Sequence, residues 1–111
     1  MAPNFKVVMT ALALISMKNI YDYIERCTGD IYYADRFSQR TIDFIKNVLS
    51  YSPFMGRIPD DEYLQKKKIR RVTTHDKKYN IFYYVDEQSH TIYIMKIANG
   101  NQSIDRQLFG L

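Results

Sequence analysis

The chain has 111 residues, of which 46% are hydrophobic and 25% are charged. We interpret residues 1–111 as one domain with a single core, and the composition argues against a disordered chain. The 16 Lys and Arg residues outnumber the 12 Asp and Glu residues, and the net charge of +4 favours anionic partners, either nucleic acid or an acidic protein surface. A solvated basic surface without a partner would explain the same charge.

Cysteine usage and hydropathy exclude further classes. Cys27 is the single cysteine, so it can form no internal disulfide and cannot by itself build a zinc site. Because Cys27 ends a helical apolar stripe, we expect it to be a small buried residue. No apolar stretch reaches the roughly 18 residues that span a bilayer, and residues 7–17 lack a convincing signal-peptide cleavage pattern. We expect a cytoplasmic protein with no cofactor, no metal and no membrane contact.

A strand and a helix are predicted at the start of the chain. Residues 4–9 form the expected strand, and Thr10 is a suitable N-cap for a helix over residues 11–27. Apolar residues at helical spacing predict the face of this helix that enters the core. They are Ala13, Met17, Ile20, Ile24 and Cys27, with Leu14 and Tyr21 widening the stripe.

A second helix follows after a sharp break. Gly29 suits the positive φ of a helix C-terminus, and Asp30 suits the N-cap of a helix over about residues 31–50. So short a connection predicts an antiparallel helical hairpin, and Pro53 ends its second helix. The expected core face of this helix carries Ala34, Phe37, Thr41, Ile45 and Val48.

Three strands are predicted in the second half of the chain. Residues 69–74, 79–86 and 91–98 are rich in β-branched and aromatic side chains, and the polar turns between them predict an antiparallel meander. In the middle strand we expect one uniformly apolar or aromatic row to face the core. That row is Tyr79, Ile81, Tyr83 and Val85. Both rows of the last strand are largely apolar, so its register stays open.

The element order is therefore β-α-α-β-β-β with a short C-terminal tail. Residues 54–59 are rich in turn formers and residues 60–62 are acidic, and we predict no further element there. This order predicts the α+β class, with a helical hairpin packed on a mainly antiparallel sheet. The first strand is expected to join the sheet beside a later strand that the sequence does not identify.

Basic residues concentrate just before and within the predicted meander. They are Lys66, Lys67, Lys68, Arg70, Arg71, Lys77 and Lys78. Such a patch could hold RNA phosphates or an acidic protein surface, and a solvated charged face is the alternative.

Three passages resemble the ParE/RelE superfamily of bacterial toxins, and more its ParE branch. They are residues 49–57, the hairpin from 69–74 to 79–85, and the closing segment 97–108. The resemblance implies the toxin of a type II toxin–antitoxin pair, held inactive by a cognate antitoxin. ParE-like members poison DNA gyrase, whereas RelE-like members cut messenger RNA on the ribosome. A homodimer or a higher complex with the antitoxin is left open.

The resemblance also implies site residues. Arg57 and Arg70 match positions where the family commonly has arginine, and the aromatic middle strand matches through Tyr79 and Tyr83. The full set that we expect to bind the target is Arg57, Arg70, Arg71, Asn99, Gln102 and Arg106.

The closing segment departs from the family. Where a His-Gly-x-Arg arrangement is common, residues 99–102 read Asn-Gly-Asn-Gln, and neutral amides cannot transfer protons. We expect His75 and His90 to be exposed turn residues. We therefore expect no catalytic residue and favour a gyrase-binding toxin. The alternatives are an endoribonuclease that acts with ribosome and mRNA, and a toxin-fold binding protein that has lost toxicity. The RNA-binding candidates are Lys66, Lys67, Lys68, Lys77 and Lys78.

Overall fold

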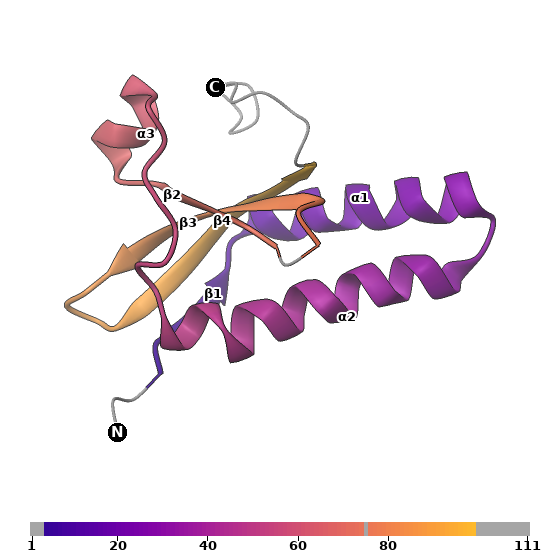
Figure 1. Cartoon of the computed structure of the whole chain (residues 1–111), viewed down its shortest axis with the longest axis horizontal. Helices are drawn as coiled ribbons and strands as arrows, with labels where there is room; N and C mark the ends of the chain where they lie inside the picture. The colour runs from indigo at the N-terminus through magenta and orange to yellow at the C-terminus, as the bar shows by residue number, and fades with distance from the viewer. Residues whose placement is uncertain (1–3, 75, 100–111) are drawn as a thin grey trace.

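The computed structural model describes residues 4–74 and 76–99. In chain order its elements are β1 (Lys6–Met9), α1 (Ala11–Thr28), α2 (Ile31–Asn47), the 3-10 turn η1 (Leu49–Tyr51), α3 (Glu62–Lys67), β2 (Arg70–Thr73), β3 (Tyr79–Asp86) and β4 (Thr91–Asn99). Helices α1 and α2 form an antiparallel hairpin against the sheet, and its connected end extends past the strands (Figure 1). In the part of the chain described, no helix has the length and hydropathy needed to cross a membrane.

The sheet confirms the predicted α+β class and element order, with one difference. Its strand order is β1-β4-β3-β2, and β3 is antiparallel to both of its neighbours. Strand β1 runs parallel to β4, with Lys6 opposite Thr91 and Met9 opposite Ile94. The sheet is therefore mixed, with β1–β4 as its parallel pair. Parallel strands need a long connection, and here it contains the helical hairpin and strands β2 and β3.

The predicted helix caps of the hairpin are confirmed. The Thr10 side chain accepts from the Ala13 N–H at 3.3 Å and donates to the Ile94 carbonyl at 2.7 Å, so it also ties α1 to β4. Gly29 has φ of +67° and ends α1 in the left-handed region. Asp30 then caps α2 by accepting from the Tyr32 N–H.

The apolar stripe of α1 is narrower and shorter than predicted. Ala13 and Met17 are buried, and Ile20 and Ile24 pack against the core. Leu14 is 55% exposed, and Cys27 is exposed as well, so both predictions were wrong. The last turn of α1, which holds Cys27, lies in the part of the hairpin that extends past the sheet (Figure 1), where no strand covers it.

The hairpin side of the sheet holds the main core. As predicted, Ile81 and Tyr83 of β3 are fully buried there, with Tyr79 and Val85 packed at its margin. In β4 the core residues are Ile92, Ile94 and Ile97.

A β-bulge explains why the register of β4 could not be predicted. Phe82 pairs with Lys96 and Tyr83 pairs with Ile94, so Met95 is an extra residue in β4. The extra residue reverses the alternation of faces, and both rows of the strand therefore read as apolar.

A second, smaller core lies on the other face of the sheet under α3, an element that we did not predict. Leu64 of α3 packs with Ile69, Phe82 and Ala98. The Asp61 side chain caps α3 by accepting from the Leu64 N–H at 3.0 Å. Six residues give too short a pattern for a helical period to be recognised.

Candidate target-binding site

The turn after η1 is fastened to the sheet through Gly56. The buried Gly56 N–H donates to Tyr83 Oη at 2.9 Å. Its carbonyl accepts from Arg70 Nη1 at 2.8 Å, and the Arg70 guanidinium lies 5.0 Å from the centre of the Phe54 ring. Two side chains of the sheet, Tyr83 and Arg70, thus hold one short turn against its edge.

Only glycine fits at position 56. A Cβ atom there would lie 2.6 Å from Tyr83 Oη and 2.7 Å from the Arg71 carbonyl oxygen. Both distances are shorter than real Cβ contacts, so a side chain at this position would push the turn away from β2.

The turn brings Arg57 next to Arg71. The two residues form an isolated antiparallel bridge, with Arg57 N–H to Arg71 O at 3.1 Å and Arg71 N–H to Arg57 O at 2.8 Å. Residues directly opposite in an antiparallel pair project from the same face, and like charges in this position repel. Arg71 is also opposite Phe82, which packs under α3. The exposed arginine pair therefore lies on the α3 side of the sheet.

The structure separates Arg70 from this pair. Arg70 is opposite Tyr83, so it faces the hairpin side, and its guanidinium is engaged with Gly56 and Phe54. We conclude that Arg70 positions the turn, whereas Arg57 and Arg71 are exposed for contact.

The other predicted site residues lie elsewhere. Asn99 ends β4 opposite Tyr79, away from the arginine pair. His90 is exposed in the β3–β4 turn as predicted, and its ring lies 4.9 Å from that of Phe5. The predictions for Gln102, Arg106 and His75 fall outside the described residues.

The predicted lysine patch divides into two groups. Lys66 and Lys67 are in the last turn of α3, and Lys68 caps it in a left-handed conformation. Lys77 and Lys78 are in the turn between β2 and β3. Four residues of β2 separate the groups by about 13 Å along the strand. The predicted lysines therefore lie in two groups at opposite ends of β2.

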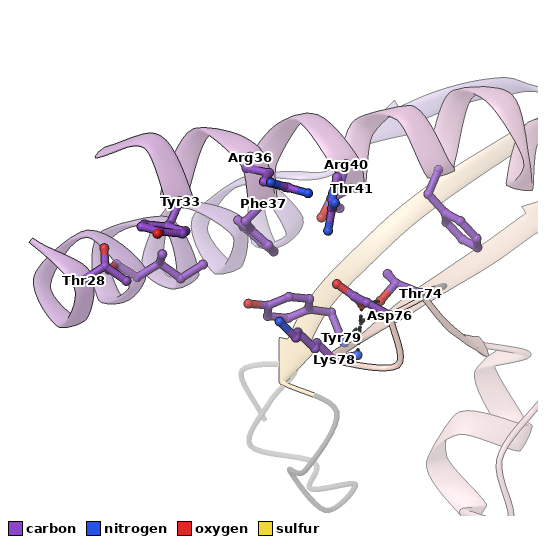
Figure 2. A pocket seen from close by; sticks show the side chains of 12 residues that line it. Thr28, Tyr33, Arg36, Phe37, Arg40, Thr41, Thr74, Asp76, Lys78 and Tyr79 are labelled. Carbon is purple, nitrogen blue, oxygen red and sulfur yellow. Dashed lines mark hydrogen bonds between the residues drawn. The ribbon is translucent and has the colours of Figure 1, made fainter. Parts of the chain in front are cut away.

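Two arginines that were not predicted as site residues line a hollow of about 500 Å³. Arg36 and Arg40 of α2 face Lys78 and Tyr79 across it (Figure 2). Their spacing of four residues puts both on one face of the helix, which in the sequence looks like an ordinary solvated stripe.

Replacing Tyr83 with phenylalanine tests the hydrogen bond that holds the turn. Burial raises the pKa of the Tyr83 hydroxyl, and the Gly56 N–H and the Arg70 charge oppose this only in part. The neutral hydroxyl therefore stabilises the fold fully below about pH 10, and this contribution is lost as the pH rises further. We expect Tyr83→Phe to lower the free energy of unfolding by about 1–3 kcal/mol at pH 7, because the buried Gly56 N–H loses its acceptor.

Urea unfolding at pH 7, 9 and 11 measures this effect, and we expect the difference between wild type and Tyr83→Phe to shrink at the highest pH. The hydrogen bond to Asp35 raises the pKa of Tyr21 to about 12, and burial raises the pKa of Tyr79. Tyr21 and Tyr79 are present in wild type and in Tyr83→Phe, so their effects on the free energy of unfolding cancel in the difference. A difference that grows with pH would contradict the role given to the hydroxyl.

Comparison with known proteins identifies the family. A family model described as the ParE toxin of type II toxin–antitoxin system, parDE, matches residues 7–104. The chain belongs to the ParE toxin family. The match includes Arg57, Arg70 and Arg71, and it confirms the resemblance that the sequence predicted.

Two solved structures resemble this ParE-family chain in fold. The chromosomal ParDE toxin–antitoxin system of P. aeruginosa gives a TM-score of 0.68 at 18% identity, covering 86% of this chain and 95% of that one. The RelBE2 toxin–antitoxin complex of Mycobacterium tuberculosis gives 0.62 at 16% identity, covering 87% and 99%. At these identities the likeness concerns the fold alone. A search of curated proteins found no significant match.

Proposed function

We propose that this ParE-family toxin arrests growth by binding DNA gyrase in the cytoplasm and that a cognate antitoxin neutralises it. Membership of a toxin–antitoxin family supports the toxin role. The two similar structures are described as toxin–antitoxin assemblies, which supports an antitoxin partner.

The composition of the turn carries the proposal of a protein target. Tyr51, Phe54 and Met55 are exposed to 61%, 47% and 44%, and Arg57 follows them in the chain. Aromatic residues, methionine and arginine are enriched at protein interfaces, and tyrosine and arginine are among the residues that carry most of the binding energy there. A partner that places a carboxylate between Arg57 and Arg71 would also relieve the repulsion of the pair.

An endoribonuclease acting with ribosome and mRNA is the second candidate. Exposed Lys66 and Lys67 belong to α3, which packs on the same side of the sheet as Arg57 and Arg71. These four cations would attract RNA phosphates.

Induced expression in bacteria that lack the antitoxin separates the candidates. A gyrase poison is expected to stop growth and switch on a DNA-damage reporter while messages stay intact. Primer extension that found codon-specific cuts in messenger RNA, without the DNA-damage signal, would instead support the endoribonuclease. Unimpaired growth at confirmed expression would reject both and favour a binding protein without toxicity.

A further inference from the structure

The hollow between α2 and the β2–β3 turn is large enough for a small organic ligand. Its volume is about 500 Å³, and small-molecule pockets span roughly 300–1,000 Å³. One wall comes from α2, and the other comes from the β2–β3 turn and the start of β3 (Figure 2). We call this space the α2 hollow and define it by Tyr33, Arg36, Arg40, Asp76, Lys78 and Tyr79.

The charged residues of the α2 hollow do not balance one another. Arg36, Arg40 and Lys78 form no salt bridge with a carboxylate of residues 4–74 or 76–99, and Asp76 is the acidic residue among the described lining residues. Burial raises the pKa of the Asp76 carboxyl, but its hydrogen bonds and the charges of Lys78 and Arg40 outweigh that effect, so its pKa lies below the usual value and it is ionised at neutral pH. Three positive charges less one negative charge leave +2. A phosphate monoester carries about −1.5 to −2 at pH 7 and would balance this charge.

The three cations lie on opposite walls of the hollow. Arg36 and Arg40 are four residues apart, so they lie one turn apart on the same face of α2. Arg36 Nη1 donates to Tyr32 Oη at 3.1 Å, which uses one of its five N–H donors. A guanidinium can bind two phosphate oxygens at once, whereas a lysine acts as a compact charge. Two guanidinium groups on α2 and the Lys78 ammonium on the other wall would therefore surround a single phosphate group.

Aromatic rings beside the cations offer a surface for a planar base. The half-buried Tyr79 ring packs 4.7 Å from the ring of Phe37, which belongs to the main core and holds Tyr79 in place. Tyr33 is 52% exposed and lines the same hollow from α2. Bases of any kind stack on such rings, because every base has a π-face. A ligand with a phosphate and a base would therefore use both parts of the lining.

The fixed carboxylate of Asp76 favours a ligand that carries hydroxyl groups beside its phosphate. Asp76 Oδ1 accepts from the Thr74 hydroxyl at 2.6 Å and from the Lys78 N–H at 3.1 Å. Its second oxygen, Oδ2, has no hydrogen bond to residues 4–74 or 76–99. This carboxylate repels a bare anion, whereas a ribose hydroxyl can donate to it. The lining therefore favours a nucleoside phosphate over inorganic phosphate.

We propose that the α2 hollow binds a nucleoside monophosphate. Its phosphate lies between the three cations, its base lies against the Tyr79 ring, and a ribose hydroxyl donates to Asp76. A nucleic acid strand needs cations along its whole backbone, whereas these cations are gathered in one hollow. The hollow lies on the hairpin side of the sheet and the Arg57–Arg71 pair lies on the α3 side, so nucleotide and target would use different faces.

Isothermal titration calorimetry on the full chain in phosphate-free buffer at pH 7.5 tests the site independently of toxicity. The probes are AMP and UMP, the nucleosides adenosine and uridine, inorganic phosphate, and a 12-nucleotide oligo-A RNA with a 5′-hydroxyl end. We expect at least one monophosphate to bind tenfold or more tightly than both its own nucleoside and inorganic phosphate. Arg36→Gln/Arg40→Gln should weaken binding of that monophosphate at least tenfold.

Arg26→Gln/Lys46→Gln is the matched control, because it removes two exposed helix charges outside the hollow. We expect it to change binding of the monophosphate less than twofold, and circular dichroism should find both variants folded. Equal losses in the two variants, no binding of either monophosphate, or tighter binding of the oligo-A RNA at the same arginines would each overturn the proposal.

Asp76→Asn tests how the hollow distinguishes a nucleotide from a bare anion. The substitution removes the negative charge but keeps Oδ1 as an acceptor for the Thr74 hydroxyl and the Lys78 N–H. We expect inorganic phosphate to bind Asp76→Asn more tightly than wild type, so that the preference for the monophosphate falls at least threefold. An unchanged preference would overturn the placement of the ribose against Asp76.

Discussion

Replacing Gly56 with alanine is expected to lower the free energy of unfolding by about 2–4 kcal/mol, because overpacking and loss of a buried hydrogen bond act together. The new methyl group would lie 2.6 Å from Tyr83 Oη and 2.7 Å from the Arg71 carbonyl oxygen. To make room, the turn must move off β2, which breaks the Gly56 N–H bond to Tyr83 and weakens the bridge between Arg57 and Arg71. Chemical denaturation at pH 7 measures the loss.

Gly29→Ala is the matched control. Gly29 has φ of +67° but no atom within 4 Å of the added Cβ, so only the left-handed conformation opposes alanine. That strain costs about 1–2 kcal/mol. If Gly56→Ala lowers the free energy of unfolding no more than Gly29→Ala does, the turn is not held by the contacts described.

Removing both exposed arginines is expected to weaken binding to gyrase at least tenfold. Truncating an arginine at an interface commonly costs more than about 1 kcal/mol, and 1.4 kcal/mol corresponds to tenfold in affinity. Arg57→Ala/Arg71→Ala should leave thermal stability unchanged or raise it slightly, since the like charges repel across the bridge. Biolayer interferometry with immobilised gyrase measures the dissociation constant.

Lys66→Ala/Lys67→Ala removes the same charge from α3 on the same side of the sheet. We expect it to change gyrase affinity less than threefold at 150 mM salt, where exposed charges beyond about 8 Å are screened. Equal losses from the two double variants would indicate general attraction of a basic surface, with no specific role for Arg57 and Arg71.

The helix ends and the core face of β3 were predicted correctly, because both depend on a few neighbouring residues. Thr10, Gly29 and Asp30 marked the helix ends because capping depends on a few neighbouring residues. The core face of β3 followed from alternation along a single strand, and Ile81 and Tyr83 are buried as expected. The family resemblance was likewise carried by short passages with recognisable order.

Features that depend on distant residues could not be predicted. The parallel partner of β1 is more than 80 positions away in the chain, and the bulge at Met95 is defined only against β3. Cys27 looked buried because its helical spacing was right, but the sheet does not reach that end of α1. Helix α3 was too short to give a period.

Only part of the candidate site could be predicted, because several of its contacts join residues that are distant in the chain. Arg57, Arg70 and Arg71 were all predicted as site residues. Because side chains alternate along β2, however, Arg70 faces one side of the sheet and Arg71 faces the other. Arg70 positions the turn through its hydrogen bond to the Gly56 carbonyl. This bond forms only because the turn folds back on the sheet. Arg36 and Arg40 line one hollow with Lys78 and Tyr79 only because α2 packs beside the β2–β3 turn, which no local pattern predicts.

A supercoiling assay with purified components shows whether this ParE-family chain inhibits gyrase by binding it. Purified gyrase is incubated with relaxed plasmid, ATP and increasing amounts of the protein. We predict dose-dependent inhibition of supercoiling by wild type and weaker inhibition by Arg57→Ala/Arg71→Ala. Undiminished supercoiling at a saturating concentration of folded protein would show that gyrase is not its target.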